Sequence, residues 1–340
     1  MKASHILISA YNINSGGGKL LLDGLLRTLP ENSIVSLFAD ARLKNTELEA
    51  IDPGRIHITY VNNGLPARIA AEYKMSRLSR GVDVHLCLGN LPPLFGSRGR
   101  VITYVHSRYL VDHSLDRQIP LRKYFVTQLE RFWFRSRLHS PQTIWVQTPT
   151  MKELVEKKYG AGLRVQVRAF LPELAAVAKK PGPEKTFVYV ASFDPHKNHH
   201  ILIEAWVRLR QEGIRPRLTL VFPQVVPEVF KAAVAREDLN IELVANSSRD
   251  ELYAVYARAD CLIHPSLFES FGIVLVEAQR AGLDIVAPEA DYVRDVVRPC
   301  ETFDPRSAKS VARSVKRYLN IPDEPVAVCG LSEIWRSLRS

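Results

Sequence analysis

The sequence predicts an α/β protein made of two doubly wound domains with parallel sheets. Short apolar segments alternate along the chain with amphipathic segments of helical spacing, which is the pattern of such domains. The chain has 340 residues, more than one ordinary core accommodates, and 46% of them are hydrophobic. Length and composition therefore favour two domains, each with a substantial core.

The predicted strands fall into two groups, separated by a linker. The first group is His5–Ala10, Ile34–Phe38, Ile56–Val61, Val84–Leu88, Val101–Val105 and Thr143–Gln147. The second group is Phe187–Ala191, Leu218–Phe222, Ile241–Val244, Cys261–His264 and Asp284–Ala287. Residues 171–185 between them are rich in proline and lysine, a linker composition. We therefore expect an N-terminal domain over residues 1–170, a C-terminal domain over 186–320, and a tail over 321–340 that packs back on the N-terminal domain.

Composition also limits the compartment and the cofactors. No apolar run approaches the roughly 18 residues of a membrane span, and the stretch Ile6–Tyr11 is too short for a signal peptide. We therefore expect a cytoplasmic protein. The four cysteines have no metal-ligand or disulfide-framework spacing, so we expect no metal and no bound cofactor; they are Cys87, Cys261, Cys300 and Cys329.

A glycine loop follows the first predicted strand and precedes an apolar helix. Gly16, Gly17 and Gly18 would let a phosphate or a sugar approach the helix start closely. The P-loop pattern fails because positions 13 and 20 hold Ile and Leu. The dinucleotide fingerprint fails because position 21 holds Leu instead of Gly. The loop is thus either a substrate-facing loop or a structural tight turn.

A histidine lies just past another predicted strand, where active sites of α/β proteins form. His106 ends the segment Thr103–His106, and Ser107 and Arg108 follow it. We predict a site at His106 that extends to these two neighbours, with a purely structural histidine as the alternative.

Two carboxylates, Glu269 and Glu277, lie eight positions apart across a predicted strand-to-helix junction. The free amides near Phe271–Ile273 would face anionic oxygens, and Gly272 would allow their close approach. Both carboxylates would then be available to accept hydrogen bonds from hydroxyl groups. The alternative is an unrelated pair of glutamates, one at the surface and one in a helix.

These segments resemble the motifs of family 4 glycosyltransferases. Residues 264–287 look like the family's E-x7-E signature, with Ser270 and Asp284 in place of a frequent Gly and Pro. Residues 188–198 resemble the family's strand-G-R-x-x-P-x-K-N element and keep Lys197, but Ser192 stands where the family usually has Arg.

The resemblance implies the GT-B architecture, in which two Rossmann-like domains face each other across a cleft. It also implies retaining transfer of a sugar from a nucleotide-diphosphate sugar to a hydroxyl of a glycan or lipid-linked glycan. In that family Lys197 would neutralise the diphosphate, Glu277 would bind the ribose, and Glu269 and His106 would contact the sugar. The remaining substrate-binding positions implied are Gly16, Gly17, Gly18, Ser192, Asn246, Ser270, Phe271, Gly272 and Ile273.

Two alternatives share this architecture. A nucleotide-sugar epimerase would use the same donor site. A non-catalytic donor-binding subunit is the other alternative. It stays open because Ser192 stands where the family usually has a positively charged Arg.

A basic, aromatic segment, residues 117–137, lies in the N-terminal domain of a chain whose net charge is +10. Its basic residues predict peripheral contact with an anionic membrane; they are Arg117, Arg122, Lys123, Arg131, Arg135 and Arg137. No nucleic-acid module is recognisable. The alternative is a helix that buries an apolar row in the core and leaves a basic face in solvent; that row is Phe125, Leu129, Phe132 and Trp133.

Overall fold

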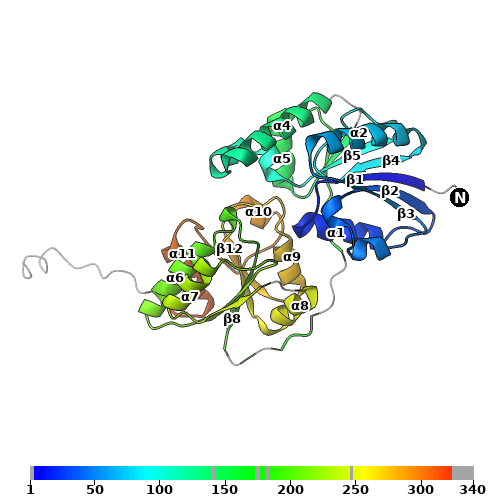
Figure 1. The fold of residues 1–340 in the computed structure, drawn as a ribbon. Coiled ribbons are helices and arrows are strands. Elements are labelled where there is room, and N and C mark those ends of the chain that lie inside the picture. Colours follow the sequence, from blue (N-terminus) through cyan, green and yellow to red (C-terminus); the bar gives the residue numbers. More distant parts are fainter. Residues whose placement is uncertain are drawn as a thin grey trace, which may run out of the picture. The chain divides into compact units, whose positions relative to one another are not determined.

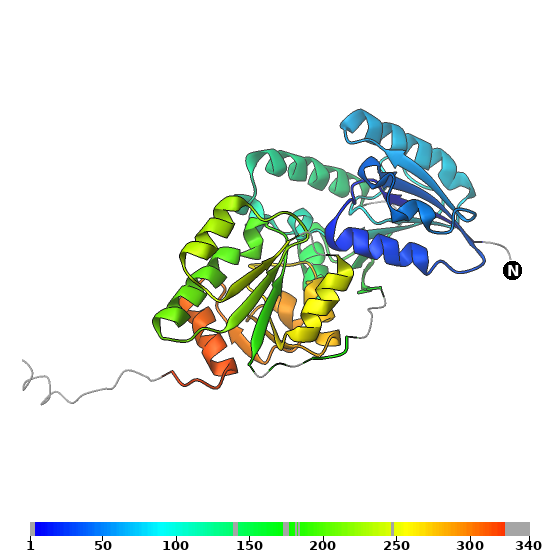
Figure 2. The ribbon, with the colours of Figure 1, turned by 60° about the horizontal axis from the view of Figure 1, so that its bottom comes forward.

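The structure is a computed structural model that describes residues 4–138, 142–172, 177–180, 182, 184–245 and 248–323. It contains two compact units, each with one parallel sheet. The first unit holds the described residues up to 172 together with Phe268–Arg280 and Ala290–Val297. The second holds the described residues of Val177–Leu267 and Ala281–Glu289 and those from Arg298 onward. Figure 1 and Figure 2 show both sheets with the helices that cover them.

The sheet of the first unit has the order β3-β2-β1-β4-β5-β6-β7, and every neighbouring pair is parallel. Its strands are β1 (Ser4–Ala10), β2 (Ser33–Asp40), β3 (Ile56–Val61), β4 (Val84–Cys87), β5 (Arg100–Val105), β6 (Gln142–Val146) and β7 (Val165–Val167). Because all strands are parallel, the loops after β1, β4 and β5 lie at the same edge of the sheet. The strand order reverses direction between β1 and β4, and doubly wound sheets bind ligands at such a switch point.

Alternate side chains of these strands pack against helices on opposite faces. On one face, Ile8 packs with Leu21 and Leu22 of α1 (Gly16–Arg27). On the other, Leu7 packs with Met75 of α2 (Leu65–Leu78). That second face also carries α4 (Leu121–Arg137) and α5 (Pro149–Tyr159), whose buried residues pack against β5 and β6. Figure 1 shows α1 on one side of the sheet and these three helices on the other.

The sheet of the second unit has the order β10-β9-β8-β11-β12-β13 and is also parallel throughout. Its strands are β8 (Thr186–Val190), β9 (Arg217–Val221), β10 (Ile241–Val244), β11 (Cys261–Ile263), β12 (Asp284–Pro288) and β13 (Glu301–Phe303). The helices in its part of the chain are α6 (His199–Gln211), α7 (Glu228–Arg236), α8 (Arg249–Arg258) and α11 (Ala308–Tyr318). Trp206 of α6 and Val311 of α11 lie in its core.

Each predicted strand coincides with an observed strand to within one or two residues at its ends, so the expected strands and the two parallel sheets are confirmed. The sequence analysis missed β7 and β13. Each has three residues and lies at the edge of its sheet, which is too short for a recognisable apolar run. The described residues of 171–185 contain no helix or strand. Most of the tail expected at 321–340 lies outside the described residues.

The alternative interpretation, in which the apolar row of residues 117–137 faces the core, is wrong for three of its four members. Phe125, Leu129 and Phe132 of α4 are 68%, 55% and 72% exposed. The helix instead buries Arg131, which lies with Asp116 in an ion pair described below. No helix within the described residues is both long and apolar enough to cross a membrane.

Two buried histidines make the stability of the fold depend on pH. Burial lowers the pKa of His85 in β4 to about 4, and burial together with the charge of Lys197 lowers that of His199 to about 4. Both nitrogens of the His85 ring lack a hydrogen-bond partner. The unfolded chain takes up protons near pH 6.5, whereas the folded chain takes them up only near pH 4, so stability falls as the pH drops between these values.

We therefore expect acidification from pH 7 to pH 5 to cost about 2 kcal/mol for each of these histidines, since each pH unit corresponds to about 1.4 kcal/mol. His85→Phe should remove about half of that combined loss. Urea unfolding followed by circular dichroism at both pH values measures it. If His85→Phe and the unmodified chain lost the same stability on acidification, His85 would not be the responsible group.

Candidate active site

The loops after β1, β4 and β5 bring the glycine segment and His106 together in the first unit. Gly16 begins α1 with a φ of +62°, a left-handed conformation that favours glycine. The preceding Ser15 makes no side-chain cap, so its hydroxyl does not occupy the amides of the first turn. A Cβ atom on Gly18 would lie 3.2 Å from Ile13 and 3.5 Å from Cε1 of His106. A side chain at position 18 would therefore crowd Ile13 and come into ordinary contact with the histidine.

His106 is held by the loop after β4. Its Nε2 lies 3.0 Å from the carbonyl oxygen of Leu88, and its backbone N–H donates to Oδ1 of Asn90 over 2.7 Å. The same Oδ1 accepts the N–H of Ser107 over 2.9 Å. Burial lowers the pKa of His106, which favours a neutral ring near pH 7. No role was predicted for Asn90 from the sequence. Its place three residues after β4 is the feature that could have indicated one, and in the structure it has a φ of +72°.

The loop that holds His106 is itself tied to the loop after β1. The side-chain amide of Asn12 donates to the carbonyl oxygen of Gly89 over 2.6 Å. A Cβ atom on Gly89 would lie only 2.0 Å from Oδ1 of Asn12, so any other residue there would displace the Asn12 side chain from this hydrogen bond.

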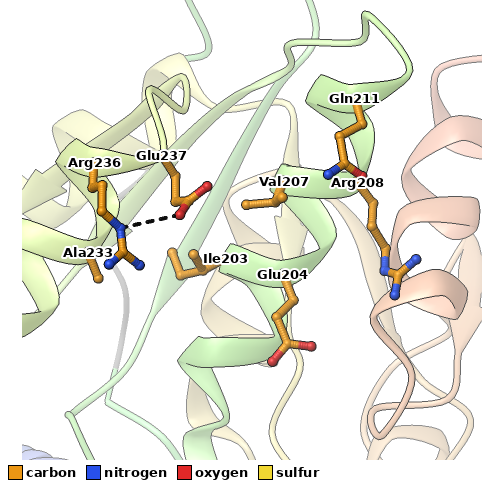
Figure 3. A pocket seen from close by; sticks show the side chains of 8 residues that line it. All are labelled: Ile203, Glu204, Val207, Arg208, Gln211, Ala233, Arg236 and Glu237. Atoms are coloured by element: carbon orange, nitrogen blue, oxygen red, sulfur yellow. Dashed lines mark ion pairs between the residues drawn. The ribbon is translucent and has the colours of Figure 1, made fainter.

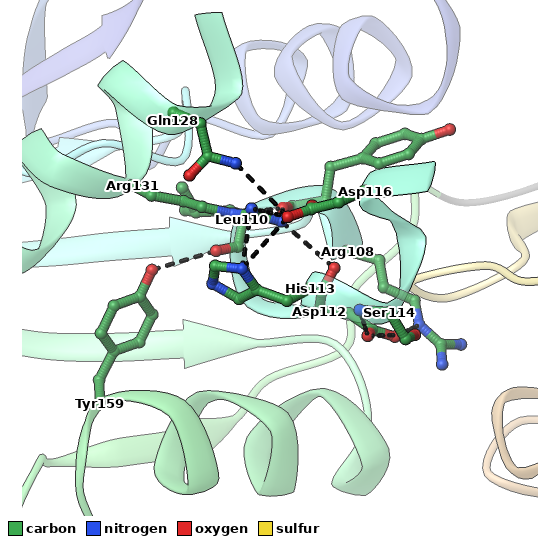
Figure 4. A network of polar contacts seen from close by, with 10 residues as sticks. Arg108, Leu110, Asp112, His113, Ser114, Asp116, Gln128, Arg131 and Tyr159 are labelled. Carbon is green, nitrogen blue, oxygen red and sulfur yellow. Dashed lines mark hydrogen bonds and ion pairs between the residues drawn. The ribbon is translucent and has the colours of Figure 1, made fainter. Parts of the chain in front are cut away.

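A buried arginine fixes the segment that follows His106 (Figure 4). Arg131 of α4 is 5% exposed and donates to the carbonyl oxygen of Tyr109 over 2.6 Å. It also forms an ion pair with Asp116, with an N–O distance of 2.7 Å, and donates to Nδ1 of His113 over 3.1 Å. The hydrogen bond from Arg131 lowers the pKa of Asp116, which keeps that carboxylate charged. α4 thereby anchors α3 (Arg108–Val111) and the 3₁₀ turn His113–Gln118.

The segment with the two glutamates joins the first unit through side-chain contacts. The hydroxyl of Thr148 donates to the carbonyl oxygen of Ser270 over 3.5 Å. The ring of Phe268 packs edge-on against Tyr109 at 5.5 Å between centroids, and Arg108 lies over the same ring at 5.9 Å. The segment therefore contacts the residues that Arg131 anchors.

Glu269 and Glu277 lie on either side of a turn at Gly272. Gly272 has a φ of +74° and precedes α9 (Ile273–Arg280). Glu269 is half-buried before the turn, and Glu277 is buried within the helix at 4% exposure. A Cβ atom on Gly17 would lie 2.6 Å from Cδ1 of Ile273, so the glycine loop and the start of α9 also meet in the first unit.

In the second unit, Lys197 lies at the carboxyl end of β8. It ends the 3₁₀ turn Pro195–Lys197, and its carbonyl oxygen accepts a hydrogen bond from the hydroxyl of Tyr189 over 2.7 Å. Ser192 at the start of this loop donates its hydroxyl to the carboxylate of Asp194. Ser192 is thus engaged within its own loop.

Hydrogen bonds connect the Lys197 loop to the residues that lead into the glutamate segment. The N–H of Leu267 donates to the carbonyl oxygen of His196 over 2.8 Å. Asn198, with a φ of +60° and 2% exposure, donates its amide to the carbonyl oxygens of Pro265 and Pro305 over 3.1 and 2.7 Å. The sequence analysis assigned no role to Asn198, which holds three loops of this unit together.

Other predicted positions have simpler outcomes. Asn246 lies outside the described residues. Ser248 caps α8 and forms a capping box with Glu251. No group of three or more His, Cys, Asp or Glu side chains in the described part of the chain is arranged to hold a metal ion.

A cavity of about 360 Å³ between α6 and α7 contains none of the predicted site residues (Figure 3). It is lined by Glu204 and Arg208 of α6, by Arg236 at the end of α7 and by Glu237, which follows that helix. Arg236 and Glu237 pair with each other at 3.5 Å. The opposite charges balance, and the cavity lies in the helical layer rather than at the strand ends, so we assign it no ligand.

Comparison with known proteins finds a family that part of the chain matches. Residues 172–328 match the family described as glycosyl transferases group 1. A D-inositol 3-phosphate glycosyltransferase of Corynebacterium efficiens is 32% identical over 126 residues, which is 35% of this chain and 30% of that protein. The lipopolysaccharide glucosyltransferase WaaG of Escherichia coli is 26% identical over 210 residues, 60% of this chain and 51% of that protein. The matches thus span about half or less of these relatives.

Among solved structures, a sucrose-phosphate synthase from Thermosynechococcus elongatus superposes with a TM-score of 0.70 at 16% identity. The superposition covers 93% of this chain and 90% of that one. The fold is therefore that of the GT-B glycosyltransferases.

Proposed function

We propose that this chain, whose residues 172–328 match the group 1 glycosyltransferases, is a retaining glycosyltransferase. It transfers a sugar from a nucleotide-diphosphate sugar to a hydroxyl of a glycan or lipid-linked glycan. The observation that carries this proposal is the hydrogen-bonded connection between the Lys197 loop and the residues that lead to Glu269. The Lys197 loop and the start of the second motif, residues 264–267, are therefore neighbours within the second unit, which supports a donor site at this loop.

Charge on the leaving group decides the proposed chemistry. In the transfer, the bond between the anomeric carbon and the phosphate oxygen breaks, and the acceptor oxygen bonds to that carbon from the same face. The departing phosphate accepts the hydroxyl proton of the acceptor. Lys197 and the amides around Gly272 and Ile273 stabilise the diphosphate that forms, since preorganised donors aimed at developing charge are the main source of such catalysis. We propose that this arrangement needs no divalent cation and no cofactor.

The remaining site residues bind and orient the donor. Glu277 accepts the ribose hydroxyls and Glu269 the hydroxyls of the transferred sugar. His106, neutral because burial lowers its pKa, bounds the sugar pocket beside Gly17 and Gly18.

A variant pair separates these two glutamates. We expect Glu277→Ala to weaken donor binding by about 10- to 100-fold, because each hydrogen bond to a charged group contributes about 1.5 to 3 kcal/mol. Glu269→Ala should bind the bare nucleoside diphosphate normally and lose turnover. Calorimetric titration with the nucleoside diphosphate and the intact donor measures both. Unchanged affinity in a folded Glu277→Ala protein would remove Glu277 from the site.

A panel of nucleotide sugars tests the function as a whole. Release of nucleoside diphosphate that requires an acceptor identifies a transferase. Formation of an isomeric nucleotide sugar would instead identify an epimerase, and binding without turnover would identify a non-catalytic subunit.

We also propose that the enzyme works in the cytoplasm against the inner face of the cell membrane, where a lipid-linked acceptor is presented. The basic residues of α4 support this part of the proposal. Arg131 does not contribute to it, since its charge is buried and paired with Asp116.

A further inference from the structure

We infer that α2 and α4 form a membrane-inserting face of the first unit, held on anionic lipid mainly by exposed apolar side chains. This inference deepens the membrane contact proposed above by naming the surface and how it binds. Electrostatic attraction alone would involve only the basic residues.

Four large apolar side chains of α4 point into solvent. They recur at helical spacing on one stripe; they are Leu121, Phe125, Leu129 and Phe132, with exposures of 77%, 68%, 55% and 72%. The helix buries Phe134 together with two polar residues, Arg131 and Thr127. α4 therefore differs from an ordinary surface helix in two ways: an ion-paired arginine faces inward, and four large apolar side chains stay exposed.

A second exposed row lies on α2, on the same face of the sheet. Leu65, Ile69 and Tyr73 repeat every four residues and are 56%, 41% and 55% exposed. Figure 1 and Figure 2 both show α2 and α4 on one side of the first sheet. The two rows together expose seven large apolar side chains on these helices, and clusters of exposed apolar side chains mark surfaces that bind proteins or membranes.

The loop around Phe95 joins the two helices. Phe95 is 49% exposed and packs edge-on against Tyr73, with 6.2 Å between ring centroids. On the other side of the loop, Trp133 donates to the carbonyl oxygen of Pro92 over 3.0 Å, and Arg137 donates to that of Pro93 over 3.1 Å. The loop around Phe95 thus contacts both helices and links their exposed rows.

The charges on this surface have one sign. Every exposed charged side chain of the two helices is basic; these are Lys74, Arg77, Arg122, Lys123 and Arg135. The two glutamates of the helices are withdrawn. Glu72 is 3% exposed and accepts hydrogen bonds from Tyr11 and from the N–H of Leu94, and Glu130 is half-buried.

Apolar side chains beside unopposed basic ones match an anionic bilayer surface, where the rows enter the acyl boundary and the basic groups meet the headgroups. Salt screens the second contribution and not the first. Binding should therefore persist at high salt, in contrast to a purely electrostatic contact.

The test uses the full chain and two kinds of vesicle, one of neutral phosphatidylcholine and one that also contains phosphatidylglycerol. We expect the unmodified protein to float with the anionic vesicles and to stay largely bound as salt rises. Phe125→Ser with Phe132→Ser should lower the vesicle partition coefficient at least about tenfold, because two large apolar side chains no longer insert. The matched control is Val229→Ser on α7, an apolar residue that is 84% exposed in the second unit and should change nothing.

The charge variant Arg122→Gln, Lys123→Gln and Arg135→Gln should weaken binding mainly at low salt. Equal flotation of the Phe125/Phe132 variant and the unmodified protein would overturn the inference. So would a concentration-dependent dimer that the same variant abolishes, because the face would then be an interface between copies of this chain. Flotation is measured without donor or acceptor, so its result stands whichever reaction the enzyme catalyses. Transfer to a soluble acceptor by the variant tests the proposed function separately.

Discussion

Replacing Lys197 with alanine is expected to lower kcat by at least about 100-fold, the range observed when one donor to a developing anion is removed. The loss should fall on turnover, since the charge of the diphosphate grows as its bond to the sugar breaks. Steady-state and single-turnover kinetics with a competent donor and acceptor measure it. Lys197→Arg should restore only part of the rate, because a planar guanidinium does not replace a compact ammonium.

Lys231→Ala is the matched control. Lys231 lies on α7, pairs with Glu228 and is outside the candidate site, so its loss should leave kcat unchanged. Treatment with EDTA should also leave the rate unchanged if Lys197 and the helix amides act alone. Full activity in Lys197→Ala would contradict the assigned role, and complete loss on chelation that Mg²⁺ reverses would contradict the metal-free mechanism.

The second large effect is on stability. Arg131→Met should lower the free energy of unfolding by about 3 to 5 kcal/mol, the usual cost of removing one partner of a buried ion pair. The variant leaves the Asp116 carboxylate without its closest cation and the carbonyl oxygen of Tyr109 without its donor. Urea unfolding measures the change.

Arg135→Met, one turn further along α4, is the comparison because Arg135 is exposed and should cost little. Adding Asp116→Asn to Arg131→Met should recover part of the loss, since the uncompensated charge is then removed. Equal, small effects of Arg131→Met and Arg135→Met would show that the network in Figure 4 contributes little.

The sequence predicted the sheets well because buried parallel strands are continuous apolar runs that need no long-range information. It also predicted that the glycine loop and His106 each follow directly after a strand. For α4 it left two alternatives open. Helical spacing of Phe125, Leu129 and Phe132 shows that they share a face but does not show whether that face points to the core or to solvent.

The missed site residues have a different cause. Asn90 and Asn198 act by bonding backbone groups of distant segments, and Asn198 and Pro305 are 107 positions apart. A local pattern contains no trace of such a partner. The only local signal is that both asparagines adopt a positive φ, which the sequence permits but does not require.

The side chain of Asn198 has a consequence for the entropy of binding. By joining the ends of β8, β11 and β13, it fixes the loop of Lys197 while the second unit folds. The conformational entropy of ordering that loop is therefore lost during folding and does not oppose association with the donor. A flexible cation of the same charge would have to be ordered in every catalytic cycle, so the structure makes the site of Lys197 preorganised.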